Sequence, residues 1–199
     1  MGRVWDLSVS KGGHLLATRD RNRIFSAQIR DNEGQLEVTG RFEFGVPRTA
    51  DDSRLEQVRF MPGSDECYAI RDTGSVQLWS LATKKSAFTS SVMSLEAGRT
   101  VHIEWCPHTP NILAVLSEPE GVSLYDIRSP GSAVFRQQSI RISPPSKARW
   151  NPFIPYWLAV STEDGIATFD LRYAATKPPA FMSIPHPNDV LTGLTLISA

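Results

Sequence analysis

The stretch Val101–Arg128, VHIEWCPHTPNILAVLSEPEGVSLYDIR, contains a pattern that occurs three times along the chain. Its Trp-x-Pro element at Trp105 has counterparts that begin at Phe60 and at Trp150, so the aromatic residue recurs every 45 residues. An alanine follows each aromatic residue at the same distance, at Ala69, Ala114 and Ala159. A glycine comes next, at Gly74, Gly121 and Gly165, and each copy then ends on an apolar segment, at residues 76–79, 122–125 and 166–169.

The repeated unit has the composition of a small antiparallel sheet. Each copy offers about four short segments with strand character, and no segment has the apolar period of a helix. Such a sheet has two apolar faces and buries them by stacking against its neighbours, which is how β-propellers are built. The sequence therefore predicts one all-β region over residues 1–199, with repeats at about 3–44, 55–94, 100–142 and 146–184 and a partial repeat at 189–198.

Strands are expected wherever apolar residues alternate or run together between turn residues. The expected strands lie near residues 4–9, 15–17, 24–29, 36–44, 57–60, 67–70, 76–81, 112–116, 122–125, 157–161, 166–171, 181–184 and 190–197, with a weaker candidate at 88–93. The aromatic residues Phe60, Trp105 and Trp150 are expected to fill the space between neighbouring sheets. The first copy is degenerate, because it lacks the aromatic-x-Pro element.

The order of these elements resembles that of the WD-repeat family of β-propellers. The segments WCP…ILAVLSEPEGVSLYDIR, ending at Arg128, and WNP…WLAVSTEDGIATFDLR, ending at Arg172, carry the resemblance, which extends over roughly residues 3–197. The chain departs from the family at Ser80, where an Asp is usual, and the family's Gly-His element does not recur. The resemblance implies a WD40-type propeller that acts as a scaffold for other proteins.

The number of repeats is lower than this resemblance implies. Family members usually close a ring of seven blades, whereas the sequence offers about four and an orphan strand near residues 190–197. We expect an incomplete or truncated propeller, either a fragment, a short isoform or an incomplete gene model. Closure with four blades is the alternative, since propellers range from about 4 to 8 blades.

Two successive copies end on the same Asp-x-Arg triplet, formed by Asp126 and Arg128 and by Asp170 and Arg172. In an extended strand, residues two apart share a face, so each Asp is expected beside its Arg. One interpretation is a local ion pair that fixes the corner of a sheet. The other is a protein-binding rim. Tandem repeats with this ending resemble those of substrate receptors of cullin-RING ubiquitin ligases, whose arginines meet the ligase adaptor.

Charge and cysteine content restrict the remaining possibilities. The 21 basic and 21 acidic side chains balance, so no net charge favours nucleic acid or an anionic membrane. A short basic stretch at residues 136–149 is too narrow for a nucleic-acid site. Cys67 and Cys106 lack metal-like spacing and are read as buried thiols of a cytoplasmic or nuclear protein.

No catalytic pattern is present in the sequence. There is no nucleophile elbow, dinucleotide fingerprint or P-loop, and no histidine stands at metal-ligand spacing from another histidine or a cysteine. We therefore expect no enzymatic activity, cofactor or metal, and no membrane partner. The function predicted is a non-catalytic scaffold in a multiprotein complex, with a ubiquitin-ligase substrate receptor as the alternative. An enzyme using carboxylates on a propeller face would need converging acids, which the sequence does not show.

Overall fold

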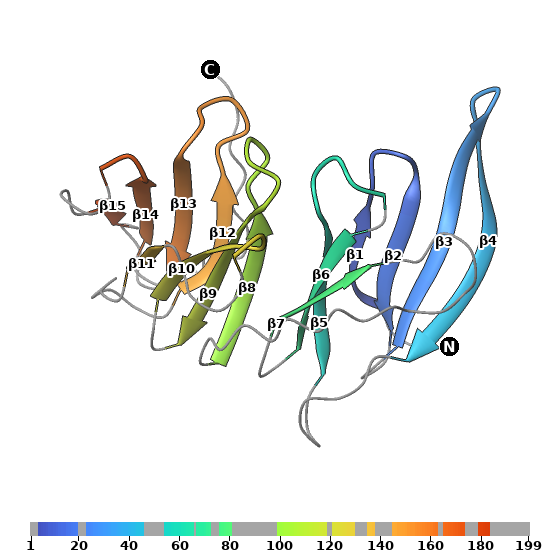
Figure 1. The fold of residues 1–199 in the computed structure, drawn as a ribbon, viewed down its shortest axis with the longest axis horizontal. Helices are drawn as coiled ribbons and strands as arrows, with labels where there is room; N and C mark the ends of the chain where they lie inside the picture. The colour runs from blue at the N-terminus through green and yellow to red at the C-terminus, as the bar shows by residue number, and fades with distance from the viewer. Residues whose placement is uncertain are drawn as a thin grey trace. The chain divides into compact units, whose positions relative to one another are not determined.

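In the computed structural model, the structure describes residues 4–19, 23–45, 54–65, 67–72, 76–80, 99–118, 121–129, 135–137, 145–162, 165–173 and 179–183. The regular structure of these residues is entirely β, and no helix occurs among them (Figure 1). The strands are β1 Val4–Val9, β2 His14–Arg19, β3 Arg23–Asn32, β4 Gln35–Gly45, β5 Leu55–Phe60, β6 Cys67–Asp72, β7 Val76–Ser80, β8 Arg99–Trp105, β9 Ile112–Glu118, β10 Gly121–Asp126, β11 Phe135–Gln137, β12 Pro145–Trp150, β13 Trp157–Thr162, β14 Gly165–Asp170 and β15 Ala180–Ser183.

The described strands form four antiparallel sheets in chain order. Three sheets have four strands, β1–β4, β8–β11 and β12–β15, and the fourth consists of β5–β7. In each sheet a strand pairs with the next one along the chain, as in a meander. The all-β prediction is confirmed, and so are the strands expected within the described residues. The expected strands at 88–93 and 190–197 lie outside the described residues.

The chain divides into two compact units, Met1–Ala97 and Gly98–Ala199. Each unit contains two sheets that belong to consecutive copies of the repeat. The expectation of one continuous region therefore stays a prediction.

In the first unit, the core lies between sheet β1–β4 and sheet β5–β7. Its buried members from the first sheet are Leu16 and Ile24, and those from the second include Val58, Phe60 and Trp79. The Phe60 ring meets Tyr68 edge to face, with 6.1 Å between ring centroids. Burial of such apolar side chains is the main stabilising contribution, about 1.5–3 kcal/mol for each large residue. The position predicted for Phe60 is confirmed.

In the second unit, the core lies between sheet β8–β11 and sheet β12–β15. Leu116 and Leu124 from the first sheet pack with Trp150, Leu158 and Phe169 from the second. Trp105, Ala114 and Ala159 of this unit are also buried, as is the matching Ala69 of the first unit. The position predicted for Trp150, in the space between two sheets, is confirmed.

Two glycines are required by the backbone. The β3–β4 hairpin turns tightly through Glu33 and Gly34, which both have positive φ (54° and 85°). At Gly165, a Cβ atom would lie 2.1 Å from the carbonyl oxygen of Met182 on β15. A side chain at this position would force β14 and β15 apart.

Candidate protein-interaction site

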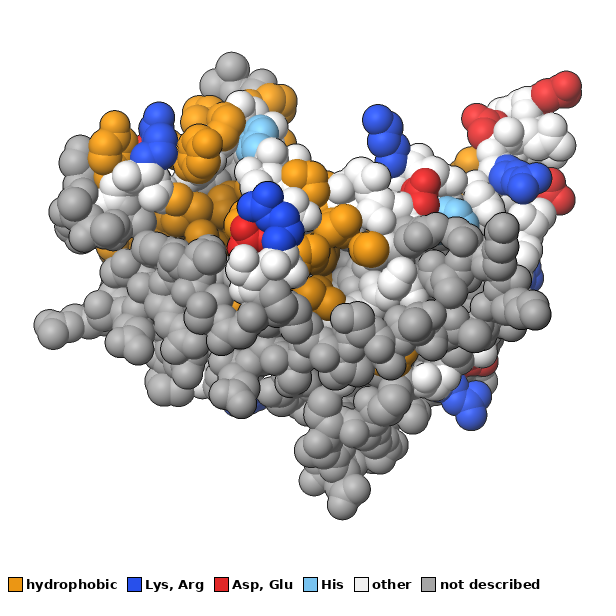
Figure 2. All heavy atoms as spheres, in the orientation of Figure 1, with side chains coloured by type: hydrophobic (Ala, Val, Ile, Leu, Met, Phe, Trp, Pro, Cys, Tyr) orange, Lys and Arg blue, Asp and Glu red, His pale blue; other side chains and the backbone are white. Residues whose placement is uncertain are grey.

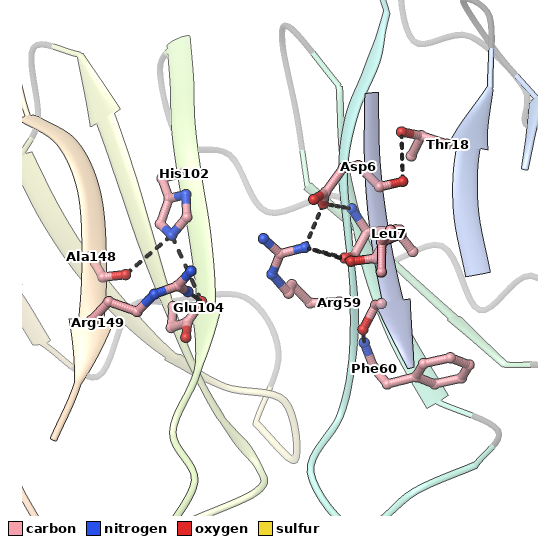
Figure 3. A network of polar contacts seen from close by, with 11 residues as sticks. Asp6, Leu7, Thr18, Arg59, Phe60, His102, Glu104, Ala148 and Arg149 are labelled. Atoms are coloured by element: carbon pink, nitrogen blue, oxygen red, sulfur yellow. Dashed lines mark hydrogen bonds and ion pairs between the residues drawn. The ribbon is translucent and has the colours of Figure 1, made fainter. Parts of the chain in front are cut away.

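Within each unit, the two sheets meet along their inner edge strands. In the second unit, β8 and β12 lie next to each other, and side chains cross the junction between them (Figure 3). His102 Nε2 lies 3.2 Å from the Ala148 carbonyl oxygen, and Arg149 bonds the Glu104 carboxylate at 2.6 Å. Trp150 Nε1 donates to the Glu104 carbonyl oxygen at 3.3 Å. The His102 contact gives a partner to the Ala148 carbonyl oxygen, which the β12–β13 ladder would leave unpaired.

The alignment of β8 with β12 determines which loops of the second unit lie at the same edge. Because β8 and β12 run side by side with matching residues in contact, both strands end at the same edge. The exposed His108, in the loop after β8, lies 3.0 Å through Nε2 from the carbonyl oxygen of Asn151, in the loop after β12. Strands β10 and β14 end at this edge too, since Asp126 pairs with Ile112 and Asp170 with Trp157. We call this edge the β10–β14 rim.

Both predicted Asp-x-Arg pairs lie on the β10–β14 rim. Asp126 accepts from the Arg128 guanidinium at 3.0 Å (Nε) and 2.6 Å (Nη2). Asp170 accepts from Arg172 in the same way, at 2.9 Å and 2.6 Å. The predicted ion pair is thus present in both copies.

The prediction that each Asp and its Arg share one face of a strand is wrong. Each Asp is the last residue of its strand, and each Arg lies in the following turn rather than on a shared strand face. The Asp side chain also accepts from the backbone N–H of its Arg, at 3.0 Å for Arg128 and 3.2 Å for Arg172. This local bond closes an Asx turn, which is a frequent role of Asp at the end of a strand.

The arginines of the two turns lower the pKa of both carboxyl groups. Hydrogen bonds from the Arg128 guanidinium lower the pKa of Asp126 to about 2. Arg172 lowers the pKa of Asp170 to about 2 in the same way. The carboxylates are mostly covered, with 14% and 23% of their side-chain surface exposed, whereas the arginines are 65% and 50% exposed. The rim therefore presents guanidinium groups outward.

Aromatic side chains surround the second turn. The Arg172 guanidinium lies over the Tyr173 ring, 5.5 Å from its centroid. The pKa of Arg172 is raised chiefly by the hydrogen bond to Asp170. The backbone of Leu171 also donates to the Tyr156 carbonyl oxygen at 2.9 Å. This part of the rim combines a cation with exposed aromatic rings.

The large apolar residues of this rim were not predicted to be exposed. They are Ile154 and the aromatic residues Phe153, Tyr156, Trp157 and Tyr173, and all are more than a third exposed. A signal was available in the sequence, because the segments after Trp105 and Trp150 have the same length but opposite polarity, CPHTPN and NPFIPY. A comparison of these two segments would have identified the apolar loop.

The two cysteines differ in how deeply they are buried. Cys106 is buried as predicted, whereas Cys67 is half-buried, and both are free thiols. Within the described ranges, no three His, Cys, Asp or Glu side chains are grouped so that they could hold a metal ion. Nor do those ranges include a helix with the length and apolar character needed to span a membrane.

Comparison with known proteins gives one partial match. No protein-family model matches the chain. The chain is 29% identical over 125 residues to the protein called Maintenance of telomere capping protein 5 of Saccharomyces cerevisiae. The match covers 62% of this chain but only 11% of the yeast protein, so the chain spans about a ninth of the length of that relative.

Proposed function

We propose that this chain is a non-catalytic scaffold of the WD-repeat propeller type, which binds other proteins within a multiprotein complex. Three features of the fold support the proposal. The sheets are meanders in chain order, neighbouring sheets within a unit pack through their inner strands, and an aromatic residue ends the inner strand of three sheets. This arrangement is the one expected of propeller blades.

The observation that carries the binding function is the β10–β14 rim of the second unit. It places two outward guanidinium groups and a set of exposed aromatic side chains on one edge. Arginine, tyrosine and tryptophan are the residues most often responsible for affinity in protein interfaces. We place the protein in the cytoplasm or nucleus.

The proposal is tested by affinity purification of the chain, followed by mass spectrometry and reconstitution with the purified partner. We expect a partner protein in stoichiometric amount, bound by the wild-type chain and lost or weakened in Arg128→Ala/Arg172→Ala. The double variant should keep the wild-type melting temperature within a few degrees, because exposed ion pairs contribute little to stability. Absence of any stoichiometric partner would contradict the scaffold function.

The ubiquitin-ligase substrate receptor is a second candidate. It is favoured by the tandem occurrence of the two Asp-x-Arg turns, each with a well-exposed arginine, on the same rim. It predicts that a cullin-RING adaptor is among the proteins recovered and that the double arginine variant loses it. Recovery of other partners without an adaptor would reject this candidate and leave the scaffold function standing.

A further inference from the structure

The loop between β12 and β13 exposes more apolar surface than a turn requires. In this loop Phe153 is 63% exposed, Ile154 46% and Tyr156 53%. The adjoining Trp157 and, from the turn after β14, Tyr173 are 41% and 47% exposed. Figure 2 shows hydrophobic, basic and histidine side chains gathered along this edge of the second unit, at the upper left of the view.

The loop between β8 and β9 provides an internal standard for this surface. The two loops have the same length, six residues, and the same closing bonds. Cys106 N donates to the Ile112 carbonyl oxygen at 2.9 Å, and Asn151 N donates to the Trp157 carbonyl oxygen at 2.9 Å. The backbone of the two loops is thus held at the same points.

The side chains of the two loops differ where they face solvent. The β8–β9 loop has His, Thr and Asn at positions 108, 109 and 111, where the β12–β13 loop has Phe, Ile and Tyr. Both loops are closed by the same bond between their strand ends, so that closure does not require the apolar side chains of the β12–β13 loop. An exposed aromatic cluster without a folding role is typical of a binding surface.

The backbone of Tyr156 supports the same conclusion. Its φ is 69°, and Glu33 and Tyr156 are the non-glycine residues with positive φ in the part of the chain that is described. A bulky residue rarely adopts this conformation, which Asn tolerates better. The matching residue Asn111 does not have positive φ, so the two loops differ in backbone at this position. Strained residues of this kind concentrate at functional sites.

The Arg172 guanidinium beside the apolar loop indicates that a ligand would carry a negative charge. Arg172 lies over Tyr173, and half of its side chain is exposed, while its partner Asp170 is mostly covered. An arginine held flat against a ring keeps donor groups free to bind a carboxylate. The cluster therefore offers an apolar surface next to a site for a negative charge.

We propose that this part of the rim is a docking site for an extended acidic segment of a partner protein. The site consists of Phe153, Ile154, Tyr156, Trp157, Arg172 and Tyr173. A carboxylate of this segment binds Arg172, and an adjacent aromatic or leucine side chain packs on the loop. The inference rests on the proposed protein-binding function and names the surface and the partner chemistry. It does not depend on which of the two candidate functions is correct.

Other occupants fit the surface less well. A second copy of the chain would bring two outward guanidinium groups together, and like charges at close range oppose association. Nucleic acid would need a wide basic face to neutralise several phosphates. Among the described residues, the β10–β14 rim offers two exposed guanidinium groups, Arg128 and Arg172, which are too few for such a face.

The test is selection of a random 12-residue peptide library, displayed on phage, on the immobilised full chain. The matched comparison is a loop-swap variant, Phe153→His/Ile154→Thr/Tyr156→Asn, which gives the β12–β13 loop the side chains of the β8–β9 loop. We expect selected peptides to combine Asp or Glu with Phe, Trp or Leu. Synthetic peptides of this kind should bind the loop-swap variant and Arg172→Ala at least about tenfold more weakly. The control Leu36→Ser, which removes an exposed apolar side chain from the first unit, should bind like wild type.

A single substitution separates binding from folding. Tyr156→Asn relieves the left-handed strain, so its melting temperature should equal or exceed that of wild type while peptide binding falls about tenfold. Equal binding by wild type and the loop-swap variant, or selection of basic peptides, would overturn the inference. So would a wild-type dimer in light scattering that the loop swap dissociates. If partners still co-purify with the chain in these cases, this docking site fails but the scaffold function stands.

Discussion

The two units use different backbone groups where their paired sheets meet: N–H donors in the first unit and carbonyl acceptors in the second. In the first unit, the edge strand β5 donates: Val58 N binds the Asp6 carboxylate at 2.9 Å and Phe60 N binds Ser8 Oγ at 3.0 Å (Figure 3). In the second unit, the edge strands accept instead, since the carbonyl oxygens of Glu104 and Ala148 are approached by side-chain nitrogens. The amides of Val58 and Phe60 and the carbonyl oxygen of Ala148 would otherwise be unpaired at a strand edge.

One residue type accounts for much of this difference. The aromatic residue that ends the inner strand is Phe60 in the first unit and Trp150 in the second. An indole can donate to a carbonyl of the neighbouring sheet, but a phenyl ring cannot. The first unit has side-chain acceptors on β1 instead, Asp6 and Ser8. An acid–arginine pair crosses the junction in both units, Asp6 with Arg59 and Glu104 with Arg149. Repeats that share a fold can therefore differ in the polar chemistry that holds them together.

The largest effect is expected where an aromatic residue fills a junction between sheets. Trp150→Ala should lower the free energy of unfolding by about 3–5 kcal/mol, because the ring is 5% exposed and lies in the core of the second unit. The same change at Trp5, which is 50% exposed on β1, should cost less than about 1 kcal/mol. Urea denaturation of both variants measures the difference. Similar costs for the two would break the comparison between buried and exposed rings.

The polar junction of the first unit is tested by Asp6→Ala. The change leaves the Val58 amide and the Arg59 guanidinium without this acceptor, and we expect a loss of about 1–3 kcal/mol in urea denaturation. Asp31→Ala is the matched control, since Asp31 accepts from Gly34 N in an exposed hairpin and its loss should cost about half as much or less. If the two losses were equal, the carboxylate of Asp6 would have no special role at the junction.

A smaller change isolates the donor that distinguishes the units. Trp150→Phe retains most of the ring but removes the bond from Nε1 to the Glu104 carbonyl oxygen. We expect a loss of about 1 kcal/mol, the usual net contribution of one hydrogen bond. Trp79→Phe is the matched control, because it loses the same ring volume and an indole bond to Gln77 on its own strand rather than one across a junction. A hydrogen-exchange experiment should show faster exchange along β8 and β12 for the first variant alone.

The sequence predicted the sheets better than the surface they present. The recurrence of Phe60, Trp105 and Trp150 every 45 residues fixed the strands and the buried positions, because burial requires the same residue type at each copy. The junction bonds were not predictable, since Asp6 and Val58 are far apart in sequence and meet only through packing. The aromatic loop at Phe153 was missed for a related reason: an apolar residue in a sequence is first interpreted as part of a core, and only its exposure shows otherwise.

The smallest expected effect concerns the Asp-x-Arg turns of the second unit. Asp126 and Asp170 end β10 and β14 there, whereas Ser80 ends β7 in the first unit. Both carboxyl groups should titrate near pH 2 rather than near their usual pKa of about 4. A depressed pKa stabilises the folded state above the unfolded pKa, and this contribution is lost as the pH falls from about 4 through 2. Arg172→Ala should return the pKa of Asp170 toward 4 and leave that of Asp126 unchanged, as followed by carboxyl ¹³C shifts in NMR. A low pKa of Asp170 that persisted in this variant would show that the backbone N–H of the turn, rather than the guanidinium, stabilises the carboxylate.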